Sequence, residues 1–118
     1  MVIGVPIESH TREHRVALVP AHVAKLRKHD VEVLVEHGAG HRAGFPDAAY
    51  QEAGARMAID RSSIFSEADV IAIVRRPEAG PGGDVARLRA GQTVIGLLDP
   101  LGKPEGLVSI AEAGVTAF

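Results

Sequence analysis

The sequence contains no cysteine and few aromatic residues, and both features narrow the possible functions. Without cysteine the chain has neither a disulfide framework nor a thiolate nucleophile, which fits a reducing compartment such as the cytoplasm. Aromatic residues make up only 3% of the 118 residues. The core must therefore be aliphatic, built from valine, isoleucine, leucine and alanine.

Long apolar runs and an excess of positive charge are missing as well. No run approaches the roughly 20 residues of a membrane-spanning helix, and no signal peptide precedes Met1, so we expect a cytoplasmic protein. A net charge of −2 leaves no basic face for nucleic acid, and we expect no nucleic-acid partner. With 46% hydrophobic against 24% charged residues, the chain should fold as a single domain around one core.

Short apolar runs alternate with helical patterns along the chain, as in a series of β-α-β units. We predict helices from Pro20 to about Asp30 and from Asp47, as N-cap, to before Gly54. The other predicted elements are short helices at Ser62–Glu67, Asp84–Arg89 and Glu105–Ala113 and strands at Val2–Val5, Val31–Val35, Val70–Val74, Thr93–Leu98 and Val115–Phe118. The predicted fold class is α/β: an open, mostly parallel sheet with helices on both faces, as in a flavodoxin-like or Rossmann-like half. Because the sequence stops inside the last predicted strand, we expect it to be part of a longer protein.

Arg15 is the first candidate for a ligand-binding residue. It lies in the polar segment after the first predicted strand, near the carboxyl edge of the sheet, where open α/β folds bind ligands. A guanidinium group there can hold a carboxylate or phosphate through two parallel hydrogen bonds. Alternatively, Arg15 pairs with Glu8 or Glu13 and only stabilises the loop. Sequence spacing leaves both interpretations open.

Further charged residues fall on the same predicted edge. Arg75 and Arg76 follow the strand Val70–Val74, and Asp99 follows the strand Thr93–Leu98. Since the carboxyl ends of parallel strands meet at one edge, we expect these side chains to form a cluster with Arg15. One aspartate facing several arginines is either a structural ion pair or part of a substrate pocket.

Two short motifs do not meet the structural requirements of the sites that they suggest. His10–His14 matches the H-x-x-E-H pattern of inverted zinc proteases, but the segment follows Pro6 and is predicted to be a loop rather than a helix. Gly38–Gly44 is not a dinucleotide fingerprint, because Ala43 occupies the third glycine position and no helix begins before about Asp47. We therefore predict no metal site and, at Gly38–Gly44, a turn.

Taken in order, the segments of the chain resemble the N-terminal domain of the alanine dehydrogenase and pyridine nucleotide transhydrogenase family. The specific part is the first block, with Gly4-Val5-Pro6-x-Glu8 and then Glu13-x-Arg15-Val16-Ala17 with Pro20. The weaker matches are Gly38-Ala39-Gly40, Phe45-x-Asp47 with Tyr50, Ala53-Gly54-Ala55, Ala68-Asp69-Val70, Arg75-Arg76-Pro77, Gly91-Gln92 and Gly114-Val115-Thr116. Together they span nearly the whole sequence.

Within this family, the resemblance favours the NAD(P) transhydrogenase alpha subunit. Alanine dehydrogenases hold the keto acid with an arginine at the position of Arg15 and a lysine at that of Arg75, and place a catalytic histidine where this chain has Asp99. A carboxylate cannot replace an imidazole that titrates near neutral pH. The resemblance makes Arg15, Arg75 and Asp99 the candidate catalytic residues, with the arginines shaping the cleft.

The resemblance also implies a reaction and its partners. The reaction is hydride transfer between NADH and NADP⁺, coupled to proton movement in the complete complex. The NAD-binding Rossmann domain would follow later in the protein, so these 118 residues alone should neither bind NAD tightly nor transfer hydride. The implied partners are that domain, a second copy of the chain, and membrane and NADP-binding subunits, with this domain on the cytoplasmic side.

Two other hypotheses remain open at this point. The chain could be the N-terminal domain of an alanine dehydrogenase-like amino-acid dehydrogenase that binds a small keto acid through Arg15 and Arg75. It could also be a standalone, non-catalytic flavodoxin-like binding module.

Overall fold

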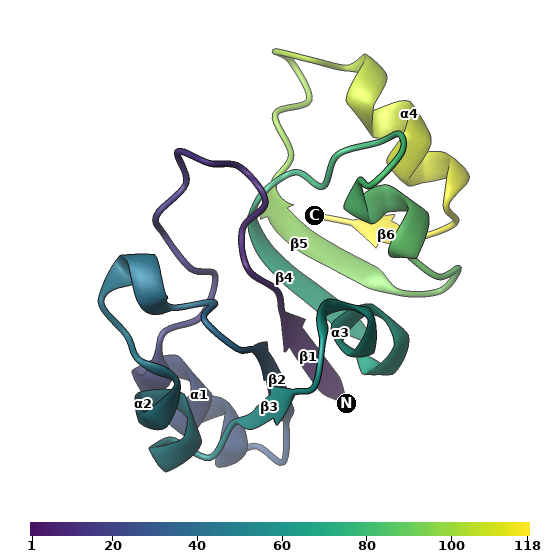
Figure 1. The fold of residues 1–118 in the computed structure, drawn as a ribbon. Helices are drawn as coiled ribbons and strands as arrows, with labels where there is room; N and C mark the ends of the chain where they lie inside the picture. The colour runs from purple at the N-terminus through teal and green to yellow at the C-terminus, as the bar shows by residue number, and fades with distance from the viewer.

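A single parallel sheet organises the chain, and a computed structural model describes all its residues from Met1 to Phe118. The six strands have the spatial order β3-β2-β1-β4-β5-β6 (Figure 1). They are β1 (Val2–Val5), β2 (Glu32–Glu36), β3 (Arg56–Ala58), β4 (Val70–Arg75), β5 (Thr93–Leu97) and β6 (Thr116–Ala117). This is the order of the doubly wound fold, in which the chain reverses its direction of winding between β1 and β4. We call the carboxyl edge between these two strands the switch point.

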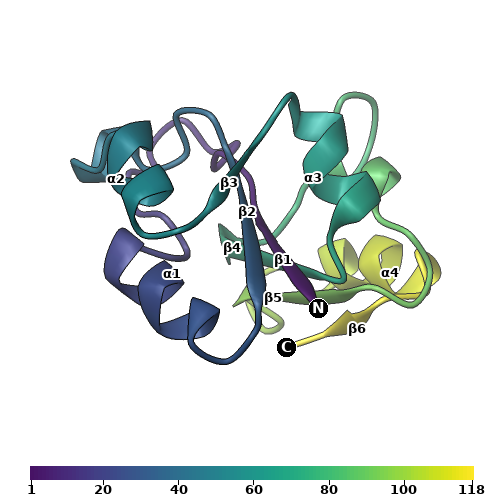
Figure 2. The same ribbon diagram turned by 90° about the horizontal axis from the view of Figure 1, so that it is seen from below.

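Helices cover both faces of the sheet. They are α1 (Pro20–Arg27), α2 (Asp47–Glu52), α3 (Arg61–Glu67) and α4 (Glu105–Glu112), with short 3-10 helices at His41–Ala43 and Asp84–Arg87. Helices α1 and α2 lie on one face, and α3 and α4 lie on the other (Figure 2). The predicted α/β class and the parallel sheet are confirmed.

Glycine in the central strand allows one of these helices to approach closely. Side chains alternate between the two faces of a strand. In β1, Val5 faces the core beneath α1 and α2, whereas Gly4 faces α3. A Cβ atom on Gly4 would lie 2.8 Å from the Cβ atom of Ala68 and 2.9 Å from the Cγ2 atom of Ile64. The backbone of β1 and helix α3 are therefore in direct contact.

Some elements differ from the sequence predictions. Strand β3 was not predicted, because Arg56–Ala58 is three residues long and begins with an exposed arginine. The helix predicted at Asp84–Arg89 is a 3-10 helix that ends at Arg87. Asp47 is the first helical residue of α2 rather than its N-cap, and Pro46 occupies the cap. The Asp47 carboxylate instead accepts a hydrogen bond from the backbone N–H of Gly38, 2.8 Å away.

One part of the sheet has no helix over it. On the face that carries α1 and α2, these helices cover β1, β2 and β3 but not β5 (Figure 2). Ile95 is therefore 47% exposed and Leu97 62% exposed, and with Phe118 they line an apolar groove of about 700 Å³. We call this surface the uncovered face. None of the helices is long and apolar enough to cross a membrane.

The contact between β1 and α3 predicts the effect of adding one methyl group. Gly4→Ala should lower the free energy of unfolding by about 1–3 kcal/mol, because the new Cβ overpacks the contact with Ala68. Ala21→Ser, at an exposed position of α1, should change it by less than about 0.5 kcal/mol. Urea denaturation measures both. A Gly4→Ala protein as stable as the parent would contradict the described packing.

Candidate functional site

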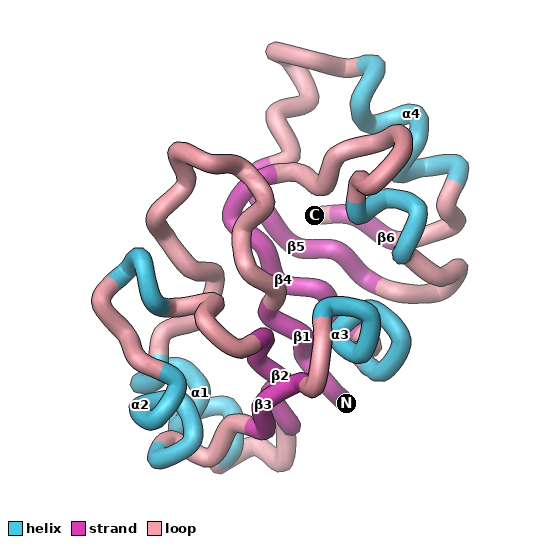
Figure 3. Tube along the Cα trace, in the orientation of Figure 1, coloured by secondary structure: helices cyan, strands magenta, loops and turns pink.

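The segment after β1 determines what the switch point can bind. In doubly wound folds that bind nucleotides there, a glycine-rich turn after the first strand leads directly into a helix. Here β1 is followed by Pro6, and residues 6–19 cross the carboxyl edge as a loop before α1 begins (Figure 3). The chain therefore offers neither a glycine-rich turn nor a helix N-terminus at this place.

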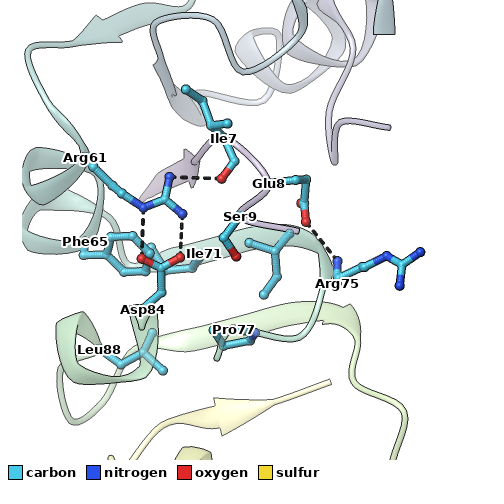
Figure 4. Close-up of a pocket in the computed structure, with 11 residues that line it drawn as sticks. Ile7, Glu8, Ser9, Arg61, Phe65, Ile71, Arg75, Pro77, Asp84 and Leu88 are labelled. Carbon is cyan, nitrogen blue, oxygen red and sulfur yellow. Dashed lines mark hydrogen bonds and ion pairs between the residues drawn. The ribbon is translucent and has the colours of Figure 1, made fainter. Parts of the chain in front are cut away.

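Glu8 attaches the start of this loop to the end of β4. Its carboxylate oxygens accept hydrogen bonds from the backbone N–H groups of Val74, at 2.5 Å, and Arg75, at 3.1 Å. Figure 4 shows the bond to Arg75. The pairing of β4 with β5 shifts register between Ala72 and Arg75, as at a β-bulge. Glu8 is buried, and this burial raises the pKa of its carboxyl group although the two backbone N–H groups oppose the shift. Both carboxylate oxygens of Glu8 are therefore bound within the protein and are not offered to a ligand.

Glu13 brings the two predicted arginines together. Its side chain is only 3% exposed, whereas those of Arg15 and Arg75 are 64% and 48% exposed. One carboxylate oxygen lies 2.7 Å from Nε of Arg15, and the other lies 2.7 Å from Nε of Arg75. The hydrogen bonds from both guanidinium groups hold the pKa of Glu13 well below its usual range. Arg15 therefore does stabilise the loop by pairing with Glu13. It also places a partly free guanidinium group beside that of Arg75 at the carboxyl edge, and we call these two exposed arginines the rim.

A second cluster, centred on Arg61, fills the space below this rim. Arg61 donates from Nε to Asp84 at 2.9 Å, and from one terminal nitrogen to Glu36 at 2.7 Å and to the carbonyl of Ile7 at 3.0 Å. Asp84 and Glu36 are largely buried. The guanidinium group also lies 5.8 Å from the centre of the Phe65 ring. Figure 4 shows Arg61 directed at Asp84 and Ile7, with the Arg75 guanidinium pointing away from them.

These side chains leave no room for a nucleotide at the switch point. The cavity that remains between Ile7, Arg61, Phe65 and Asp84 measures about 10 Å³. This is about the space that one water molecule needs. The cavity at the switch point is therefore too small for a nucleotide. Sequence reasoning did not find Arg61 or Asp84, because no local pattern distinguishes them from surface charges.

Asp99 lies apart from the two arginines that Glu13 holds. Its carboxylate accepts a hydrogen bond from the backbone N–H of Gly102, at 3.1 Å, within the loop after β5. It makes no ion pair with Arg15 or Arg75, so the structural ion pair, one of the two alternatives left open by the sequence, is not formed. Asp99 and Arg75 both line an open pocket of about 510 Å³, which Arg15 does not reach.

The two short motifs lie in loops. The segment His10–His14 contains no helix, and its glutamate, Glu13, is bound to the two arginines. No group of three or more histidine, aspartate or glutamate side chains lies close enough together to hold a metal ion. Gly38–Gly44 forms the predicted turn, with a short 3-10 helix and a positive φ of 88° at Gly44.

Arg61 should contribute more to stability than an exposed arginine with two ion pairs. Arg61→Ala removes the only ion-pair partner of Glu36 and leaves Asp84 with only Arg87, 3.5 Å away, so we expect a loss of about 3 kcal/mol in the free energy of unfolding. Arg56 makes two ion pairs on the surface, and Arg56→Ala should cost about 1 kcal/mol or less. Urea denaturation of the two variants tests this difference. Equal losses would contradict the role of the Arg61 cluster.

Glu13 should make stability depend on pH in the acidic range. Because its pKa is lowered in the folded state, the unfolded chain binds the proton first as the pH falls below about 4. The stabilisation by Glu13 is thus present at neutral pH and lost in acid. Glu13→Gln should be less stable at neutral pH and lose less stability on acidification, as measured by urea denaturation at several pH values. Glu52→Gln, at an exposed position, is the control. If the free energies of unfolding of Glu13→Gln and the parent changed in parallel with pH, Glu13 would not be the source of the pH dependence.

The chain is similar to known proteins along its whole length. The family described as alanine dehydrogenase/PNT, N-terminal domain, matches residues 4–118. The NAD(P) transhydrogenase subunit alpha of Cereibacter sphaeroides is 38% identical over 116 residues, which are 98% of this chain and 22% of that protein. The alanine dehydrogenase of Halomonas elongata is 36% identical over 118 residues, which are 100% of this chain and 31% of that protein.

A solved structure agrees with these sequence similarities. The crystal structure of transhydrogenase from Sinorhizobium meliloti has a TM-score of 0.91 and 37% identity to this chain, and the match covers 100% of this chain and 34% of that one. The chain spans less than a third of the length of the two curated relatives. The family resemblance inferred from the first sequence block is thus confirmed, and the chain belongs to the alanine dehydrogenase/PNT N-terminal domain family.

Proposed function

We propose that the chain is the N-terminal domain of a NAD(P) transhydrogenase alpha subunit. In the complete protein the reaction would be hydride transfer between NADH and NADP⁺, coupled to proton movement. This domain would form one wall of the nucleotide cleft. The observation that carries the proposal is a filled switch point beneath a rim of exposed arginines. Such an edge can face a bound nucleotide but cannot contain one.

Charge at the rim supports this role. Arg15 and Arg75 share the single carboxylate of Glu13, and Glu8 is occupied by backbone N–H groups. The two exposed guanidinium groups thus share one carboxylate partner, and the Glu8 carboxylate is buried beneath them. The part of each guanidinium group that Glu13 does not bind is directed to solvent, where it can attract an anionic substrate or cofactor group. NAD itself would be held by a second domain, and this chain alone should bind it weakly.

Asp99 favours a transhydrogenase over an alanine dehydrogenase. The chain is about equally similar to both kinds of relative, at 38% and 36% identity, so overall similarity does not decide between them. Asp99 is exposed and accepts a hydrogen bond within its own loop. Histidine is the side chain whose ordinary charge change falls between pH 5 and 8, and this chain has no histidine at that position. The proposed reaction needs no proton-transferring side chain from this domain. Arg15, Arg75 and Asp99 would shape the cleft.

The uncovered face supports the proposed partners. Exposed apolar patches of this kind mark interaction sites in many proteins. Ile95, Leu97 and Phe118 are exposed on this face, and Arg15 lies at its border. We propose that the NAD-binding domain of the same protein or a second copy of the chain packs nearby. The membrane and NADP-binding subunits would complete the assembly on the cytoplasmic side.

An alanine dehydrogenase-like enzyme is the second candidate, and the pairing of Arg15 and Arg75 on Glu13 favours it. Two guanidinium groups held on one carboxylate could together receive the carboxylate of a small keto acid. This candidate requires proton transfer by a group that Asp99 cannot replace.

Exchange of this domain into the two relatives distinguishes the candidates. In the Cereibacter sphaeroides transhydrogenase, a chimera that carries residues 1–118 in place of the matching segment should retain hydride transfer between NAD(H) and NADP(H). The corresponding chimera of the Halomonas elongata alanine dehydrogenase should lose at least about 100-fold in kcat for pyruvate, because one positioned proton-transfer group contributes about that much.

Two further variants complete the design. Asp99→His together with Arg75→Lys should restore part of the pyruvate activity in the Halomonas elongata chimera. Arg27→Lys, on an exposed arginine in the last turn of α1, is the control and should restore none. Two results together would overturn the proposal in favour of the second candidate. They are full pyruvate activity of the alanine dehydrogenase chimera without further substitutions, and no hydride transfer by the transhydrogenase chimera.

A further inference from the structure

Glu8 is a buried carboxylate without a cation partner. The residue is 8% exposed, and none of the ion pairs of the protein includes it. Glu36 and Asp84, the other acids below the rim, both pair with Arg61. A buried carboxylate without such a partner is costly, and the cost is avoided when the group binds a proton. Glu8 is therefore the acid of this edge that is best placed to bind one.

Charged groups of both signs lie around Glu8. Glu13, in the same loop, is ionised and repels a negative charge on Glu8, whereas Arg61, from α3, attracts it. The Arg75 guanidinium group, from β4, is bound to Glu13. The remaining charged or titratable groups beside the two small cavities that Glu8 lines are His14, Arg15, Arg42 and Asp84. Burial outweighs the attractive contacts, so the pKa of Glu8 is raised.

The end of β4 that Glu8 binds is irregular. Between Ala72 and Arg75, β4 has two residues, whereas the matching part of β5 has only Gly96. This is the count of a β-bulge, at which the ladder of hydrogen bonds is locally disrupted. A Cβ atom on Gly96 would lie 2.7 Å from the carbonyl oxygen of Ile73, so the two backbones approach closely here. Both hydrogen bonds of Glu8 go to the second half of the bulge, and the path of β4 therefore depends on them.

We propose that Glu8 is a proton switch for the end of β4. As a carboxylate, Glu8 accepts from the backbone N–H groups of both Val74 and Arg75. A proton taken up from solvent binds Oε2, which makes the longer of the two bonds, at 3.1 Å to Arg75. This oxygen becomes a hydroxyl group that donates, so the bond from the Arg75 N–H breaks while Oε1 keeps the bond from Val74. The backbone at the end of β4 is then less constrained. This inference does not depend on the proposed function.

The two buried glutamates of the loop titrate in a fixed order. The pKa of Glu8 is raised and that of Glu13 is held well below its usual range, so Glu8 binds a proton first as the pH falls. Because the folded state binds this proton more tightly than the unfolded chain, ionisation of Glu8 costs stability as the pH rises through its folded pKa. Protonation of Glu8 thus does not unfold the domain. The switch acts while Glu13 still holds both arginines.

NMR spectroscopy of the 118-residue chain, labelled with ¹³C and ¹⁵N and followed over a range of pH, tests the proposal. The side-chain carboxyl carbon of Glu8 should titrate in one step with a midpoint above about 4.3, the ordinary pKa of glutamate. The backbone amide of Arg75 should titrate with the same midpoint. Its protection from hydrogen exchange should fall about tenfold on protonation, as expected for the loss of one hydrogen bond to a charged group.

Three variants identify the group that binds the proton. Glu8→Gln cannot ionise, so the titration step of the Arg75 amide should disappear. Glu13→Gln removes the neighbouring negative charge and should move the midpoint to lower pH, which tests the site even if Glu8→Gln disturbs the loop. Glu78→Gln, on an exposed carboxylate in the loop after β4, is the control and should leave the midpoint unchanged.

Four results would each overturn the proposal. They are a Glu8 midpoint at or below the ordinary value, an Arg75 amide that does not follow Glu8, an Arg75 step that persists in Glu8→Gln, and a midpoint that Glu78→Gln moves as far as Glu13→Gln does. Each of them leaves the chimera experiments unaffected.

Discussion

Two buried glutamates that bind the end of β4 are the constraint on which the carboxyl edge depends. Glu8 accepts from the backbone of Val74 and Arg75, and Glu13 accepts from the Arg75 side chain. These three hydrogen bonds connect a loop that contains no helix or strand to the centre of the sheet. Without them residues 6–19 would have no fixed path across the switch point, and Arg15 would have no fixed position. The positions of the exposed arginines therefore depend on two buried carboxylates, those of Glu8 and Glu13.

The same strand order serves a different purpose here than in a nucleotide-binding sheet. In the latter, backbone N–H groups at the switch point are left free for a phosphate. In this domain the protein supplies the anions itself: Glu8 takes the N–H groups of β4, and Asp84 and Glu36 take Arg61. The interior of the edge thus holds more acidic than basic side chains, and the exposed guanidinium groups of Arg15 and Arg75 lie outside it. The topology alone would have suggested a nucleotide site, and the side chains argue against it.

Sequence patterns predicted the parts of this structure that are local. Strands β1, β4 and β5 were found because they are continuous apolar runs. Strand β3 was missed because at this edge of the sheet only Ala58 of its three residues is buried. The carboxyl-edge position of Arg15 and Arg75 follows from topology. Their meeting on Glu13 does not, because residues 13 and 75 approach only through the crossing of the loop over β4. Arg61 was missed for the same reason, since its partners come from three separate segments.

The uncovered face has a consequence for the behaviour of the domain in concentrated solution. Natural sheets protect exposed edges with lysine, proline or bulges, but the edge strand β6 contains neither lysine nor proline. Exposed apolar side chains on the neighbouring strand β5 add to this surface. We therefore expect the separate domain to associate through it at high concentration. A covering partner therefore contributes solubility as well as assembly.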